Sequence, residues 1–238
     1  MLIHSKKLYD DRLAALDGEI GHVKDLYFDD KNWVVRYVVA DTGSWLAGRL
    51  VLLSPHAFGR LDELTSVLKV NLTRAQIERS PAIDSQMPVS RQYEIDYYRY
   101  YGWPMYWNGG AMWGMASCPA IVPPSKAEIE EGFRLHHRDD KHLQSAHAVS
   151  GYSIEASDGT MGYMRGLLVD DRSWAIEEIA VDAGHWYSEK EIRISTREIE
   201  RISYEESRIF VRLTKADIRR TLENEVAAAE PVSAVATD

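Results

Sequence analysis

Histidines and aspartates gather between residues 136 and 147, where they could hold a metal ion or respond to pH. The set comprises Asp139, Asp140, His136, His137, His142 and His147. Zinc favours histidine and carboxylate ligands at spacings that bring them together on a helix or hairpin. His137 and His142 are five residues apart, which does not place them on one helix face. The spacing therefore favours a solvated junction, with a pH-sensitive charge patch as the alternative because imidazole titrates near neutrality.

Acidic residues at expected turns are a second candidate for a cation site. They are Asp29, Asp30, Asp41, Asp170, Asp171 and Asp182. Calcium needs six or more oxygens that converge on one point, whereas two adjacent aspartates in a turn point apart. We expect these residues to form turns. A small-ligand, metal or pH sensor, built from the His136–His147 junction and these turns, is the alternative function.

Catalytic motifs are not evident. The single cysteine, Cys118, lies between Ser117 and Pro119 with no base placed to activate it. There is no nucleophile elbow and no glycine-rich phosphate loop. We expect no enzyme, no catalytic residues and no cofactor or metal. One cysteine also excludes an internal disulfide.

The elements that would position any site are written twice. Residues 1–81 and 142–222 align without a gap at an offset of 141 positions. Asp29-Asp30-x-x-Trp33, for example, corresponds to Asp170-Asp171-x-x-Trp174. An internal repeat of this length predicts two domains of about 80 residues each. Residues 82–141 form a connector with a short helix ending near 136, and residues 223–238 the end of a helix and a frayed tail.

Each copy has the pattern of a small β-domain. Asp-Gly pairs mark tight turns, and β-branched residues enrich the segments 20–28 and 33–40 and their equivalents. Thr73 with Gln76, and the equivalent Thr214 with Asp217, indicate a helix start. The prediction is a mainly β protein with two small antiparallel barrels, each followed by a short helix.

The connector holds the most aromatic stretch of the chain, within residues 93–113. Rigid aromatic side chains with a polar tip suit protein interfaces. The same rings could instead pack between the domains or over a barrel mouth. The candidate interface residues are Tyr97, Tyr98, Tyr101, Trp103, Tyr106, Trp107 and Trp113.

Composition narrows the partners. The formal net charge of −9 argues against a nucleic-acid surface, which needs clustered lysine and arginine. No apolar run is long enough for a spanning helix, and the N-terminus lacks the apolar segment of a signal peptide. We therefore expect a cytoplasmic protein.

The repeated motifs resemble the PRC-barrel family. The shared pattern is Asp-Gly-x-x-Gly, Asp-Asp-x-x-Trp, a Val/Ile-rich strand and Asp-x-Gly-x-Trp. The likeness covers both copies, and the segment 97–107 is similar to the connector of tandem PRC-barrel proteins of bacteria. The family includes the cytoplasmic part of the photosynthetic reaction-centre H subunit and the ribosome maturation factor RimM.

The resemblance implies a non-enzymatic scaffold or adaptor that binds a protein partner. A site at the cytoplasmic face of a membrane complex, as for the H subunit, fits this expectation, and a homodimer is compatible with it. The chain has neither the transmembrane helix of the H subunit nor the N-terminal domain of RimM. Their particular functions are therefore not carried over.

Overall fold

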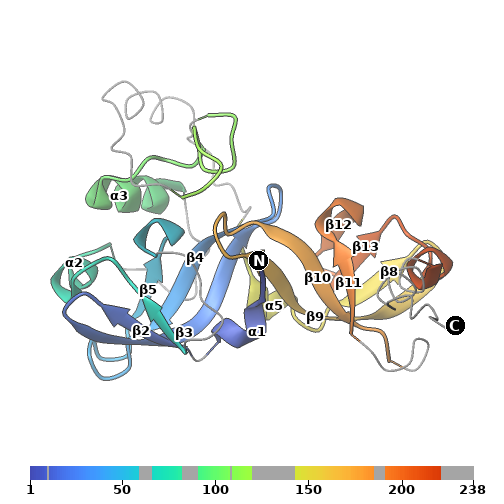
Figure 1. Cartoon of the computed structure of the whole chain (residues 1–238), viewed down its shortest axis with the longest axis horizontal. Helices are drawn as coiled ribbons and strands as arrows, with labels where there is room; N and C mark the ends of the chain where they lie inside the picture. The colour runs from blue at the N-terminus through green and yellow to red at the C-terminus, as the bar shows by residue number, and fades with distance from the viewer. Residues whose placement is uncertain are drawn as a thin grey trace, which may run out of the picture.

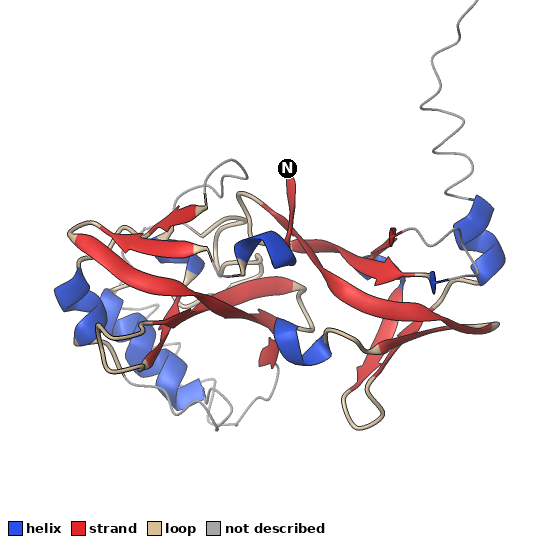
Figure 2. Ribbon diagram, turned by 90° about the horizontal axis from the view of Figure 1, so that it is seen from below, coloured by secondary structure: helices blue, strands red, loops and turns tan. Residues whose placement is uncertain are grey.

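A computed structural model of the chain describes residues 1–9, 11–58, 66–81, 91–107, 109–119, 143–184 and 191–220. The fold is mainly β, as predicted. The described strands form two sheets that lie side by side, with the N-terminal strand between them (Figures 1 and 2).

The first sheet has six described strands in the order β5-β4-β3-β2-β6, with β7 also paired to β3. The strands are β2 (Arg12–Ala15), β3 (Gly18–Asp29), β4 (Val34–Asp41), β5 (Leu50–Leu53), β6 (Val67–Lys69) and β7 (Leu143–Ser145). We call this sheet and the residues packed on it the first half.

The second sheet has seven described strands in the order β11-β10-β9-β8-β13-β12, with β1 also paired to β9. The strands are β1 (Leu2–His4), β8 (Ser153–Ala156), β9 (Gly159–Asp170), β10 (Ile176–Asp182), β11 (Glu191–Ser195), β12 (Ile199–Ser203) and β13 (Arg208–Val211). This sheet forms the second half.

Short helices join and flank the strands. They are α1 (Ser5–Leu8), α2 (Arg74–Glu78), α3 (Arg91–Tyr101) and α5 (Ala146–Val149), with the 3₁₀ turns η1 (Pro55–Ala57) and η3 (Thr196–Glu198). The capping box predicted for Thr73 and Gln76 is confirmed at the start of α2. The connector contains α3, whereas the helix predicted to end near residue 136 and the tail at 223–238 lie outside the described residues.

The prediction of two closed antiparallel barrels is wrong for the described strands. Both sheets are open and mixed, because β2 pairs with β6, and β8 with β13, in parallel. Alternation of apolar and polar residues identifies a strand but carries no information about the direction in which it pairs. The closed, all-antiparallel arrangement was therefore an assumption that the sequence pattern did not support.

The two halves exchange their first strands. β1 pairs with β9, Leu2 opposite Asp170, whereas β7 pairs with β3, Leu143 opposite Asp29. Both partners of the second pair differ from those of the first by 141 positions (2 + 141 = 143; 170 − 141 = 29). The halves also meet at an isolated antiparallel bridge between Val34 and Ala175, which are equivalent positions.

Positive backbone φ explains part of the repeated pattern. Gly21 has φ +127° and Gly162 φ +151°. A Cβ at either position would lie under 3.0 Å from a backbone carbonyl, of Asp41 or of Asp182, a separation that Cβ atoms essentially never show. The second glycine of Asp-Gly-x-x-Gly is therefore required both by φ and by the close approach of the neighbouring strand.

Candidate functional site

The connector lies over one face of the first half. Helix α3 runs above β4 and β5, and the chain then loops back toward the middle of the molecule (Figure 1). The hydroxyl of Tyr97 donates to the Leu52 carbonyl at 3.0 Å and accepts from the Ser54 N–H at 2.9 Å. These two hydrogen bonds attach α3 to the free edge of β5 and to the residue after it.

The seven predicted interface residues are mostly inside the molecule. Five of them are at most 5% exposed: Tyr97, Tyr98, Trp103, Tyr106 and Trp113. Tyr101 and Trp107 are half-buried and pack against the same hydrophobic cluster. The burial favours the packing alternative, in which these rings attach the connector to the first half.

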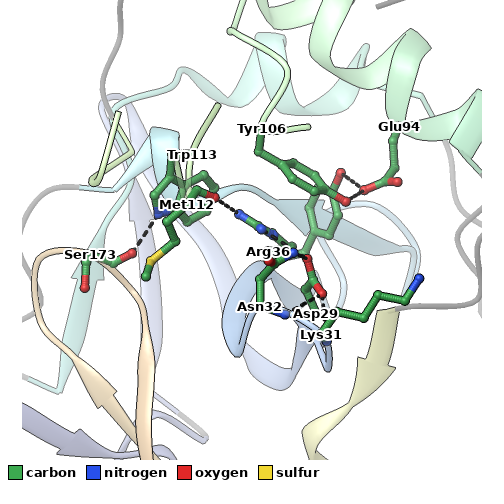
Figure 3. A network of polar contacts seen from close by, with 10 residues as sticks. Asp29, Lys31, Asn32, Arg36, Glu94, Tyr106, Met112, Trp113 and Ser173 are labelled. Carbon is green, nitrogen blue, oxygen red and sulfur yellow. Dashed lines mark hydrogen bonds and ion pairs between the residues drawn. The ribbon is translucent and has the colours of Figure 1, made fainter. Parts of the chain in front are cut away.

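A buried arginine lies beneath the connector. Arg36 is 1% exposed, and its Nη2 forms an ion pair of 3.1 Å with Oδ2 of Asp29. Its Nη1 donates to the Met112 carbonyl at 2.7 Å (Figure 3). The guanidinium also lies 3.9 Å from the ring centroid of Tyr106 and 4.9 Å from that of Trp113. A buried charge is tolerated only when it is paired in this way.

Asp29 has several partners besides Arg36. It accepts from the backbone N–H of Lys31 and of Asn32, at 3.0 and 3.1 Å, and from the Asn32 side-chain amide at 2.8 Å. Burial alone would raise the pKa of Asp29, but the bonds from Asn32 and the charge of Arg36 outweigh burial, so the pKa is lowered. Asp29 is therefore an ionised structural carboxylate.

A second buried carboxylate joins the connector to β4. Glu94 of α3 is fully buried, and its Oε1 accepts hydrogen bonds from the hydroxyls of Tyr37 at 2.9 Å and Tyr106 at 2.7 Å (Figure 3). Burial first, and the nearby Glu94 second, hold the pKa of Tyr37 well above its ordinary value. Both tyrosines are thus neutral donors to Glu94.

His56 completes the cluster. Its ring stacks on Trp103 at 5.5 Å between centroids and meets Trp113 edge-on at 5.1 Å. Nδ1 lies 3.0 Å from Oγ of Ser54, whereas Nε2 is buried with no hydrogen-bond partner in the described part of the chain. Burial, and then the charge of Arg36, lower the pKa of His56 to about 4.

The polar cluster thus consists of Asp29, Arg36, Tyr37, His56, Glu94 and Tyr106, closed over by the tryptophans Trp103 and Trp113. It also contacts the second half, because Nε1 of Trp113 donates to the Ser173 carbonyl at 2.7 Å. Its ionisable groups bind one another and are shielded from solvent. The arrangement suits attachment of one segment to another, and it offers no exposed group for chemistry on a substrate.

The histidine junction is only partly described. His136, His137 and His142 lie outside the described residues. The backbone N–H of His147 donates to Oδ1 of Asp25 at 3.0 Å, and its ring meets that of Tyr9 at 6.3 Å. Within the described ranges, no group of three or more His, Cys, Asp or Glu side chains could hold a metal ion.

The acidic turns have structural partners. Asp41 and Asp182 each accept from the N–H of the glycine two positions on, at 2.9 and 3.0 Å. Asp170 accepts from the N–H of Arg172 and of Ser173. Turn formation is therefore the observed role of these three aspartates. Two others bind groups distant in sequence: Asp171 the N-terminal amine at 2.6 Å, and Asp30 the hydroxyl of Tyr204 at 2.5 Å. The lone cysteine, Cys118, is exposed.

Sequence reasoning missed the charged members of the cluster. One signal was present: Arg36 interrupts the apolar run 34–40, where a charge needs a buried partner if both faces of the strand are covered. The equivalent of Arg36 is Glu177, so the difference between the copies marked this position. Nothing comparable singles out Glu94 or His56, whose partners are distant in sequence.

No protein-family model matches this chain, and no curated protein matches it either. Among the described residues, every helix is too short or too polar to cross a membrane. The resemblance to PRC-barrel proteins consequently depends on the quoted residues alone.

Proposed function

We propose that the chain is a non-enzymatic scaffold or adaptor of the PRC-barrel type. On this proposal the connector belongs to the first half, and a protein partner binds the second half on the face equivalent to the one that the connector covers. The cytoplasmic side of a membrane complex is the location that the resemblance implies.

One observation carries the proposal: equivalent positions on the two halves differ in burial and charge. Arg36 and His56 are buried under the connector, whereas their equivalents Glu177 and Arg197 are exposed. Tyr37, fully buried, corresponds to the half-buried Glu178. The face that takes a covering segment in the first half is thus a charged, accessible surface in the second half.

The charges on that face are suited to a polar protein surface. Exposed Glu177, Arg193 and Arg197 present both signs. Mixed charges give orientation and specificity to an encounter rather than attraction to a polyanion. A folded protein with complementary charges therefore fits this face better than a nucleic acid, which the net charge of −9 also disfavours.

The proposal is tested with the full chain as bait in cell lysate, beside two charge-reversed variants. E177R/R197E alters the proposed face without changing net charge. E19R/R79E reverses two exposed charges on the first half and serves as the matched control. We expect one defined protein to be retained by wild type and the control and lost by E177R/R197E, with direct binding of the purified protein at least about tenfold weaker, near 1.4 kcal/mol.

Equal capture by both variants would contradict the proposed face. Absence of any reproducible partner would contradict the adaptor function. In that case a rise in Tm on adding a divalent metal ion or a small molecule would support the sensor alternative, because a ligand that binds only the native state raises stability.

A further inference from the structure

The two strand exchanges are built from different residues at equivalent positions. Where β1 crosses β9, the contact involves His4, Ser5 and Gly166. Where β7 crosses β3, the equivalents are Ser145, Ala146 and Asp25. The two crossings share the same strand register, so their differences in size and hydrogen bonding can be compared position by position.

At the first crossing a large side chain lies over a glycine. A Cβ at Gly166 would lie under 3.0 Å from both His4 Cε1 and Ser5 Oγ. His4 also caps α1, because its Nδ1 accepts from the Lys6 N–H at 3.1 Å. The buried hydroxyl of Ser5 accepts from the backbone N–H of Leu167 at 3.0 Å.

At the second crossing a small side chain lies beside a carboxylate. Oδ2 of Asp25 accepts from the Ser145 hydroxyl at 2.5 Å, and Oδ1 accepts from the His147 N–H at 3.0 Å. Oδ1 also accepts from the Leu26 N–H at 2.7 Å. Leu26 is the equivalent of Leu167, so this backbone donor is satisfied by its own strand and needs no hydroxyl from Ala146.

Pairing between like halves would fail in both combinations. A first strand laid on its own kind of sheet would bring His4 and Ser5 to Asp25, where the side chain occupies the space that only a glycine leaves open. Strand β7 laid on β9 would bring Ser145 and Ala146 to Gly166. The Ser145 hydroxyl would lose its carboxylate, and the buried Leu167 N–H would lose its acceptor.

We infer that these six residues make the two halves specific for each other, so that each half accepts the first strand of the unlike half and rejects that of its own kind. A second copy of this chain can exchange strands with it only in the same unlike combination. The inference does not depend on the proposed function, because it concerns the contact between the halves and not the exposed face of β10. Specificity of this kind comes from clashes and lost hydrogen bonds in the wrong pairing as much as from contacts in the right one.

The test exchanges the codes of the two first strands in the full chain. The variant H4S/S5A/S145H/A146S leaves Asp25 and Gly166 unchanged, so unlike pairing is mismatched and like pairing is matched. We expect Tm to fall by about 5 °C or more. We also expect the mass in solution, from size exclusion with light scattering after refolding, to rise with protein concentration beyond that of wild type, because like halves can meet only between chains.

A six-fold variant separates specificity from simple damage to the fold. Adding D25G and G166D to the four substitutions exchanges both crossings completely and restores matched unlike pairing. We expect it to regain the wild-type mass and all but a few degrees of Tm, since only the exposed contact of His4 with Glu191, at 3.6 Å, is lost. A four-fold variant with wild-type Tm and mass, or a six-fold variant no better than the four-fold one, would overturn the inference.

Discussion

The hydroxyl of Tyr37, on the central strand β4, donates a 2.9 Å hydrogen bond to Oε1 of Glu94, on the connector helix α3. Both side chains are fully buried, and 57 residues separate them in the chain. The connector is thus attached to the first half by a specific polar contact within the apolar packing. Such contacts fix one arrangement among several that apolar packing alone would allow.

Replacing Tyr37 by Phe tests this attachment. The substitution preserves the ring and removes one donor, leaving Tyr106 as the remaining hydroxyl on Oε1. We expect the free energy of unfolding, measured with urea, to fall by about 1–3 kcal/mol, because a buried carboxylate loses a hydrogen bond. The matched control is Tyr100→Phe, whose exposed hydroxyl bonds to the Gln76 carbonyl at 2.8 Å. Equal losses in the two variants would mean that burial gives the Tyr37 bond no added importance.

Replacing Arg36 by Met tests the buried ion pair. Met roughly preserves the length of the chain but leaves Asp29 ionised without its countercharge, which typically costs about 3–5 kcal/mol. The double variant D29N/R36M should be more stable than R36M in the same urea titration, because it removes the unpaired charge. Arg165→Met, which breaks the exposed pair with Asp182, should change stability little. A double variant less stable than R36M would argue against an unpaired charge as the cause.

The local features of the fold follow from the sequence because their causes are local. The turn at Asp17-Gly18 and the capping box at Thr73 each depend on residues within a few positions. The exchange of first strands does not follow, since β1 has the same apolar pattern whether it pairs with β3 or with β9. Its choice depends on what lies opposite His4, which only the three-dimensional register reveals.

The candidate site was predictable in its aromatic residues and not in its charges. The seven connector aromatics stand out by composition, and the two alternatives considered for them were packing and interface. The sequence could not decide between these, because a buried and an exposed ring have the same residue type. Arg36 and Glu94 are paired with groups that lie far away in the chain, and no local pattern connects such partners.

Acid should weaken the fold through His56. Its pKa of about 4 in the folded state lies below the ordinary 6.5, by burial first and by the charge of Arg36 second. Between these two values the unfolded chain binds more protons than the folded one, so stability is full above pH 6.5 and declines as pH falls toward 4. The expected loss over that window is roughly 3 kcal/mol, measured by urea unfolding at successive pH values.

The variant His56→Phe separates this contribution from others. Phe retains an aromatic ring between Trp103 and Trp113 and removes the titrating group. The slope of stability against pH should become shallower without vanishing, because burial also lowers the pKa of His4. The variant His4→Ala should remove that remaining part. An H56F chain with the wild-type slope would show that His56 stays neutral in the native state without linking protonation to unfolding, which contradicts its burial beside Arg36.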